Sequence, residues 1–207
     1  MAEQNGTYHH GDLRAALLDE AADMIAEGGV ESVTMREIGW RLGVSRAAPY
    51  RHFADKNALL VAVAAAGFHR LADRLQSIGA GAPRSSVERL RRMGEEYVRF
   101  AVQNPAHYRL MYGREALARQ DRPELHEAAI ALFEQLVGVI RIHQKNGGIK
   151  RQDPRAQAYV AWSAMHGLAS LWIEGHILAT DDIDGLIRQT TRTVLDGMRI
   201  RRRHDRE

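Results

Sequence analysis

The stretch from Ser45 to Lys56 collects side chains that can bind nucleic acid. It reads SRAAPYRHFADK, so that basic residues stand among small ones. An arginine guanidinium can hydrogen-bond to a guanine edge, and small neighbours allow close approach to the major groove. If the stretch forms a short helix, its outward residues are Arg46, Ala47, Arg51 and His52, with Ser45 and Lys56 at its flanks.

Pro49 stands where that helix should run. Proline inside a helix removes one backbone hydrogen bond and costs about 3 kcal/mol. With Ser45 as the N-cap, Pro49 is the fourth helical residue, so only the bond to the Ser45 carbonyl is lost. We therefore expect a helix from Arg46 to Phe53 with a stiffened first turn.

Two further helices are expected to position this segment. An apolar stripe predicts the first over residues 12–27, and Gly28 and Gly29 end it. Thr34 and Glu37 form a capping box for a short helix ending at Gly43, which supplies a tight turn. Two short helices joined by a turn and supported by a third are the helix-turn-helix arrangement. The residues expected to pack inward are Leu13, Leu17, Ala21, Val33, Ile38, Leu42, Val44, Tyr50 and Phe53.

Two residues of the second helix depart from the usual helix-turn-helix pattern. Gly39 stands where alanine is usual, at a cost of about 1 kcal/mol in helix propensity. Trp40 is large for an outer face, and it either packs against the start of the next helix or lies exposed near a DNA backbone.

Helical periodicity continues to the end of the chain, and no segment alternates as a strand does. Asp55 can cap a long helix over residues 56–77, and the sequence GAGAPRSS after it is the clearest break. Five more helices are expected, over residues 86–103, 105–112, 123–145, 154–177 and 183–201. The sequence predicts an all-α fold of about nine helices. Residues 1–55 form an N-terminal three-helix domain, residues 56–77 link it, and residues 78–207 form a C-terminal bundle.

Composition excludes several classes of protein. The chain has 207 residues, 45% of them apolar, and no cysteine, which rules out disulfides and thiolate sites. No apolar run approaches the roughly 20 residues that span a bilayer, and no signal peptide precedes the first helix. A soluble cytoplasmic protein without a membrane partner is expected. The net charge is only +3, but residues 36–56 hold five basic and two acidic residues, which indicates a local anion-binding surface.

Catalytic and metal-binding patterns are missing from the sequence. The segment from His126 reads HEAAI and lacks the second histidine of the H-E-x-x-H zinc motif. There is no nucleophile elbow and no phosphate-binding glycine loop. We expect no catalytic residue, no metal site and no cofactor.

The stretch from Tyr8 to Phe68 resembles the DNA-binding domain of the TetR family of bacterial transcriptional regulators. The resemblance rests on GVS, YRHF and DK followed by an apolar run, in order and at matching spacing. It implies a homodimer that binds double-stranded operator DNA. It also implies base or phosphate contacts from Ser45, Arg46, Ala47, Tyr50 and His52, and phosphate contacts at Thr34 and Lys56. For Tyr50, a packing role and a phosphate contact through the hydroxyl remain equally open.

The C-terminal part resembles one subgroup of the same family, through Trp162, His166 and Gly167 in a W…HG pattern. Residues 104–113 resemble the short helix beside the effector cavity of relatives. A pocket for a small, largely apolar molecule would then be formed by Tyr97, Phe100, Tyr108, Met111, Tyr112, Phe133, Trp162, Met165 and His166. The alternative is that these residues only fill a helical core. Small residues in the last two helices favour a dimer interface there.

These features predict a ligand-responsive repressor that binds a pseudo-palindromic operator as a dimer and releases it when a small molecule binds. Two alternatives remain open. One is an activator or a ligand-independent regulator with the same DNA-binding domain. The other is a helical ligand-binding or scaffold protein that no longer binds DNA.

Overall fold

The computed structural model describes residues 13–78, 87–113, 122–178 and 180–200. Within them the chain forms eight α-helices and two short 3₁₀-helices, and these residues contain no β-strand, which confirms the all-α fold class. The α-helices are α1 (Leu13–Gly28), α2 (Met35–Arg41), α3 (Lys56–Ile78), α4 (Val87–Gln103), α5 (Pro105–Tyr112), α6 (Pro123–Lys145), α7 (Pro154–Ile173) and α8 (Ile183–Met198). The 3₁₀-helices are η1 (Val30–Ser32) and η2 (Pro49–Arg51).

Most predicted bounds agree with the structure to within a residue or two. Asp12, Ser86 and Arg201, where predicted helices began or ended, and the break at residues 79–86 lie outside the described residues. The largest difference is α7, which ends at Ile173 and not at Ile177. Gly175 explains this end: its φ is 75°, and the His176 amide donates to the Leu171 carbonyl (2.8 Å), as in a Schellman cap.

The turn after α2 forms as the sequence predicts. The Glu37 amide donates to Thr34 Oγ1 (3.1 Å) at the start of the helix. At its end Gly43 has a φ of 66°, and the Val44 amide donates to the Gly39 carbonyl (2.9 Å). A left-handed residue flanked by these bonds reverses the chain, and glycine adopts that conformation without the strain of a side chain.

The predicted α-helix from Arg46 to Phe53 is wrong. The segment consists of turns and the 3₁₀-helix η2. Pro49 has no amide to donate to the Ser45 carbonyl, which instead accepts from the Ala48 amide (2.9 Å). The next bonds also span three residues, from the Arg51 amide to the Ala48 carbonyl (3.2 Å) and from the His52 amide to the Pro49 carbonyl (3.1 Å). The Pro49 carbonyl also accepts from the Phe53 amide (3.0 Å), a bond that spans four residues. Proline therefore tightens the segment as far as His52, beyond its first turn.

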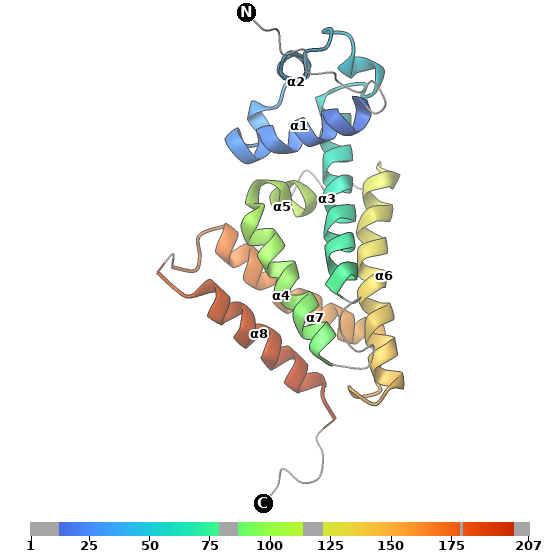
Figure 1. Ribbon diagram of the computed structural model, residues 1–207. Coiled ribbons are helices and arrows are strands. Elements are labelled where there is room, and N and C mark those ends of the chain that lie inside the picture. Colours follow the sequence, from blue (N-terminus) through green and yellow to red (C-terminus); the bar gives the residue numbers. More distant parts are fainter. Residues whose placement is uncertain (1–12, 79–86, 114–121, 179, 201–207) are drawn as a thin grey trace, which may run out of the picture.

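Helix α3 joins the two ends of the molecule. Figure 1 shows α1 and α2 at one end, α4 to α8 towards the other, and α3 running from the first group into the second. Asp55 caps α3 by accepting from the Ala58 amide (2.7 Å), as predicted. The helix packs against α1, α4, α5 and α6, and its buried face belongs to one hydrophobic cluster that includes residues of both groups. A displacement of α3 would thus be felt at both ends.

Helix α5 approaches α3 closely at Gly67. A Cβ atom there would lie 2.5 Å from His107 Nε2 and 2.8 Å from the Met111 sulfur, so only glycine leaves room for α5. The His107 ring, which is almost fully buried, hydrogen-bonds through Nε2 to the Val63 carbonyl of α3 (3.0 Å). Since α5 also packs against α1, it is a second connection between the two groups of helices. The boundary between domains at residues 55 and 78 stays a prediction.

Candidate functional sites

The polar and small residues predicted to contact DNA gather on one exposed surface around the turn after α2. Exposed members are Thr34, Ser45, Arg46, Ala47, Tyr50, Arg51 and His52, and Lys56 is partly exposed. Tyr50 is 56% exposed, so it does not pack inward, whereas Phe53 is 5% exposed and belongs to the core. The structure therefore leaves the Tyr50 hydroxyl accessible to a phosphate.

Some of the basic side chains on this surface form ion pairs with carboxylates, and others do not. The Arg41 guanidinium donates to Glu27 (2.9 Å) and Glu20 (3.1 Å), and these hydrogen bonds raise its pKa. Lys56 Nζ lies 3.8 Å from a carboxylate of Glu31. In contrast, Arg36, Arg46 and Arg51 pair with no carboxylate in the part of the chain that the structure describes. Three unpaired guanidinium groups make the surface attractive to a polyanion.

Arg36 was not among the residues predicted to contact DNA, and two positions were open for Trp40. The structure shows Trp40 74% exposed, the most exposed of the large apolar side chains in the described residues. It lines a shallow depression with Arg36, Ser45 and Arg46. Residues 36 and 40 are four apart on α2 and so share a face, a spacing that was visible in the sequence.

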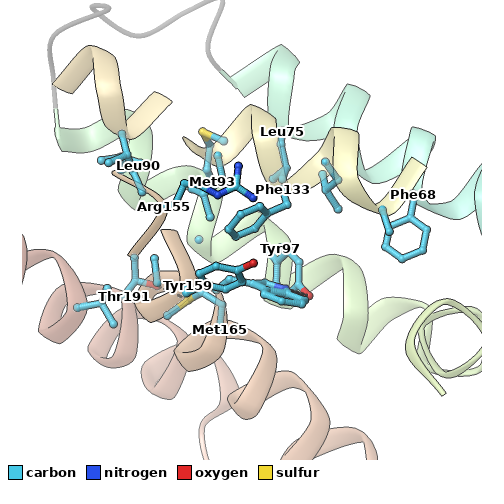
Figure 2. Close-up of a pocket in the computed structure, with 18 of the residues that line it drawn as sticks. Phe68, Leu75, Leu90, Met93, Tyr97, Phe133, Arg155, Tyr159, Met165 and Thr191 are labelled. Atoms are coloured by element: carbon cyan, nitrogen blue, oxygen red, sulfur yellow. Dashed lines mark hydrogen bonds between the residues drawn. The ribbon is translucent and has the colours of Figure 1, made fainter. Parts of the chain in front are cut away.

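A cavity of about 330 Å³ lies within the bundle formed by α3, α4, α5, α6, α7 and α8 (Figure 2). Its wall is mostly aliphatic and aromatic. The apolar lining residues include Phe68, Leu75, Leu90, Met93, Tyr97, Tyr112, Leu132, Phe133, Leu136, Ile140, Trp162, Met165, Val194, Leu195 and Met198. This volume lies at the lower end of the range for small-molecule sites.

Five of the nine residues predicted for a pocket line this cavity. They are Tyr97, Tyr112, Phe133, Trp162 and Met165. Phe100, Tyr108, Met111 and His166 do not line it, which corrects the prediction for these four. Phe100, Tyr108 and Met111 are almost wholly buried in the core, and Tyr108 and His166 lie behind the wall, where they support Tyr97.

Hydrogen bonds connect the cavity wall to α5. Trp162 Nε1 donates to the Tyr97 hydroxyl (2.9 Å), which lies 2.9 Å from the Tyr108 hydroxyl. The Tyr108 hydroxyl in turn lies 2.5 Å from His166 Nδ1. One arrangement satisfies every donor: Trp162 to Tyr97, Tyr97 to Tyr108, and Tyr108 to an unprotonated His166 Nδ1. Burial raises the pKa of Tyr97 and of Tyr108, so both phenols remain protonated donors.

Two residues at the rim of the cavity were not predicted. Arg155 and Tyr159 project from α7 beside the Phe133 ring, as Figure 2 shows. The Arg155 guanidinium lies 5.4 Å from the centre of that ring and donates to the exposed Glu134. These hydrogen bonds with Glu134 raise the pKa of Arg155. The periodic signal was available, since residues 155, 159 and 162 share a helix face with Met165.

Two other kinds of site were sought. In the described ranges, no group of three histidine, aspartate or glutamate side chains is placed to hold a metal ion. None of the helices described combines the length and the apolar character needed to cross a membrane.

Two protein-family models match the parts of the chain that form the exposed surface and the cavity. The model of bacterial regulatory proteins of the tetR family matches residues 17–63, and the model of the tetracyclin repressor-like C-terminal domain matches residues 90–194. The chain belongs to the TetR family. It is a DNA-binding transcriptional regulator with a helix-turn-helix.

Two individual proteins resemble the chain over different lengths. Nucleoid occlusion factor SlmA of Pectobacterium carotovorum is 30% identical over 153 residues, covering 72% of this chain and 75% of that protein. An HTH-type transcriptional repressor of Mycobacterium tuberculosis is 38% identical over 64 residues, covering 31% of this chain and 34% of the other.

Two solved structures extend the likeness over nearly the whole chain. A protein of unknown function from Rhodococcus sp. RHA1 has a TM-score of 0.83 and 32% identity, covering 96% of this chain and 100% of its own. A TetR-family regulator from Pectobacterium atrosepticum has a TM-score of 0.72 and 25% identity, covering 92% and 95%.

Proposed function

We propose that this TetR-family regulator is a cytoplasmic repressor that binds a pseudo-palindromic operator as a homodimer and releases it when a small molecule enters the cavity. The observation that carries the proposal is the position of α3. Its first residue, Lys56, borders the DNA-binding surface, and Phe68 and Leu75 of the same helix line the cavity. Twelve residues of helix span only about 18 Å, so a change in the cavity wall acts on the DNA-binding surface through one rigid element.

The DNA contacts follow from the exposed surface. Arg46 and Arg51 form no ion pair with a carboxylate of the described residues, and they border a tight turn that presents Ser45 and Ala47 to the outside. We assign base-edge contacts to Arg46, Ala47 and His52, because small and bidentate side chains suit the major groove. The groups at the margin, Thr34, Tyr50 and Lys56, are assigned to phosphates, which fix the register but carry no sequence information.

A dimer is supported by an exposed apolar stripe on α7. Val160 is 60% exposed and Leu171 is 47% exposed, and both lie on the same helix face as Gly167. A Cβ atom at Gly167 would meet nothing within 4 Å, so a second helix can approach closely there. A two-fold axis through this stripe would present two DNA-binding surfaces to successive turns of one duplex.

Ligand release requires that the molecule bind one dimer geometry more tightly than the other. The cavity wall draws on six helices, so that a bound ligand can favour a different packing of α3 against α4 and α6. The conformer with the DNA-binding surfaces at the wrong separation would then hold the ligand and lose the operator.

The direct experiment is selection of bound duplexes from random double-stranded DNA by the full-length protein, followed by footprinting. The proposal expects an inverted repeat whose half-sites lie one helical turn apart, about 34–36 Å. Selected sequences that share no inverted repeat would overturn the dimeric operator. Run-off transcription from a promoter that contains the selected site then distinguishes a repressor, which lowers the transcript, from an activator, which raises it.

A further inference from the structure

We infer that the ligand of the cavity is an amphipathic anion, with an apolar body that fills the cavity and a carboxylate-like head that binds Arg155 at the rim. This inference rests on the proposed function, because it names the chemical class of the molecule that the regulator responds to. It follows from three features of the cavity: its apolar wall, its internally satisfied polar groups and the sign of its charge.

The wall of the cavity selects for an apolar body. Most of the lining side chains are aliphatic or aromatic, from Leu90 and Met93 at one side to Phe68 at another (Figure 2). Such a wall offers few hydrogen-bonding partners, so a polar body would lose its bonds to water without replacement. An apolar body gains by leaving water.

The polar groups inside the wall are occupied. The Trp162 indole donates to Tyr97, and Tyr97 and Tyr108 continue the chain to His166. The Thr191 hydroxyl lies 3.4 Å from the Met165 sulfur. A ligand head that bonded to either of these groups would have to compete with an existing hydrogen bond. The polar end of the ligand is therefore expected at Arg155, whose side chain is 49% exposed.

The charge at the rim is positive. Among the described residues that line the cavity, Arg155 carries the only permanent charge, and none is a carboxylate. The other basic residue among those that line the cavity is His126, which is exposed on α6. A cationic head would meet a like charge with no counter-ion in the wall, whereas an anionic head finds a guanidinium that can donate two parallel hydrogen bonds.

The ion pair of Arg155 with Glu134 at the rim is exposed and not buried. Its side chain is 49% exposed, and that of its partner Glu134 is 40% exposed. Glu134 does not line the cavity, and it draws the guanidinium over the Phe133 ring, which does. Exposed ion pairs contribute little to stability, so a ligand carboxylate can take the place of Glu134 at small cost. Glu134 binds Arg155 from outside the cavity, and a ligand carboxylate would compete with it for the guanidinium.

The test is isothermal titration calorimetry of the full chain with three probes that share one apolar tail: decanoate, decanol and decyltrimethylammonium, each below its micelle concentration. Decanoate is expected to bind at least tenfold more tightly than decanol, and the cation least tightly. Arg155→Gln should bring the decanoate-to-decanol ratio close to one without changing the affinity for decanol, and Arg155→Lys should keep part of the preference. Glu134→Gln, the matched control, should strengthen decanoate binding and leave decanol unchanged.

Equal affinity of the wild type for decanoate and decanol would overturn the inference, as would a preference that survives Arg155→Gln or an absence of binding by all three probes. Thermal melting of each variant checks that it is folded. The proposed function is tested separately by adding decanoate to the complex with selected DNA. If decanoate binds through Arg155 but the protein stays on the DNA, release by a ligand is contradicted, while the inferred chemical class of the ligand stands. If decanol releases the DNA and decanoate does not, control by a ligand is supported and the inferred anionic head of the ligand is refuted.

Discussion

Removing the Tyr97 hydroxyl should destabilise the protein more than removing the Tyr108 hydroxyl, although the two phenols hydrogen-bond to each other. In Tyr97→Phe the Trp162 indole loses the tyrosine hydroxyl that accepts its hydrogen bond at 2.9 Å. In Tyr108→Phe the Tyr97 hydroxyl can donate instead to His166 Nδ1, which lies 3.2 Å away. The first variant leaves one donor unsatisfied and the second leaves none.

The magnitudes follow from this difference. An unsatisfied donor in a partly buried site costs about 1–3 kcal/mol, whereas the net loss of one hydrogen bond with its partners satisfied costs about 0.5–1.5 kcal/mol. For a chain of this size, about 1 kcal/mol corresponds to roughly 2–4 °C in Tm. We expect Tyr97→Phe to lower Tm by roughly 4–8 °C and Tyr108→Phe by roughly 2–4 °C.

Thermal unfolding at pH 7.5, followed by circular dichroism, measures both Tm shifts. Urea unfolding at the same pH gives the two changes in free energy, and the m-value checks that the unfolded states are comparable. Phe replaces Tyr with the same ring, so packing is matched in the two variants. A Tyr108→Phe variant as destabilised as Tyr97→Phe, or more so, would show that the hydrogen-bond order from Trp162 to His166 is wrong.

Three further predictions concern the positions of single residues. Gly39→Ala should raise the free energy of unfolding by about 0.5–1 kcal/mol in urea titrations, because the new Cβ meets Pro49 at an ordinary 3.5 Å, and Gly43→Ala should lower it, because that residue has a φ of 66°. Gly67→Ala should cost about 1–3 kcal/mol, since its Cβ would overlap His107, and a neutral outcome in the same assay would contradict the close approach of α5. Burial lowers the pKa of His107 below its unfolded value near 6.5, so the unfolded state binds its proton first and stability falls as pH drops below about 6.5. His107→Gln should flatten the loss of stability between pH 7.5 and 5.5, and exposed His69→Gln should not; equal slopes in all three proteins would refute this.

The helix-turn-helix could be predicted from the sequence because its signals are local. Thr34, Gly43 and Asp55 each cap or end a helix through bonds to backbone a few residues away, and all three act as predicted. The third helix failed for a local reason as well. The penalty of Pro49 was counted as one missing bond, but its i−4 carbonyl instead accepts from Ala48, and the three-residue spacing continues as far as His52.

The cavity was less predictable. The aromatic and methionine residues predicted for a pocket lie on helices that do surround the cavity. Whether such a side chain lines the cavity or lies behind its wall depends on the rotation of each helix about its axis. Tyr108 and His166 are turned away from the cavity for this reason, and Arg155 is turned towards its rim. Long-range packing among six helices sets these rotations, and no short stretch of sequence carries that information.

The central claim is that the exposed turn after α2 reads DNA, and Arg46→Ala tests it most directly. Fluorescence anisotropy with the selected duplex, against a scrambled duplex at the same salt, gives the specific affinity. The control is Arg141→Ala, which removes the same charge from an exposed position in the C-terminal part of α6, far from α2 in Figure 1. We predict that Arg46→Ala weakens specific binding by about 1–3 kcal/mol and that the control changes it little. A specific affinity that stays within a few tenths of a kcal/mol in Arg46→Ala would contradict the account.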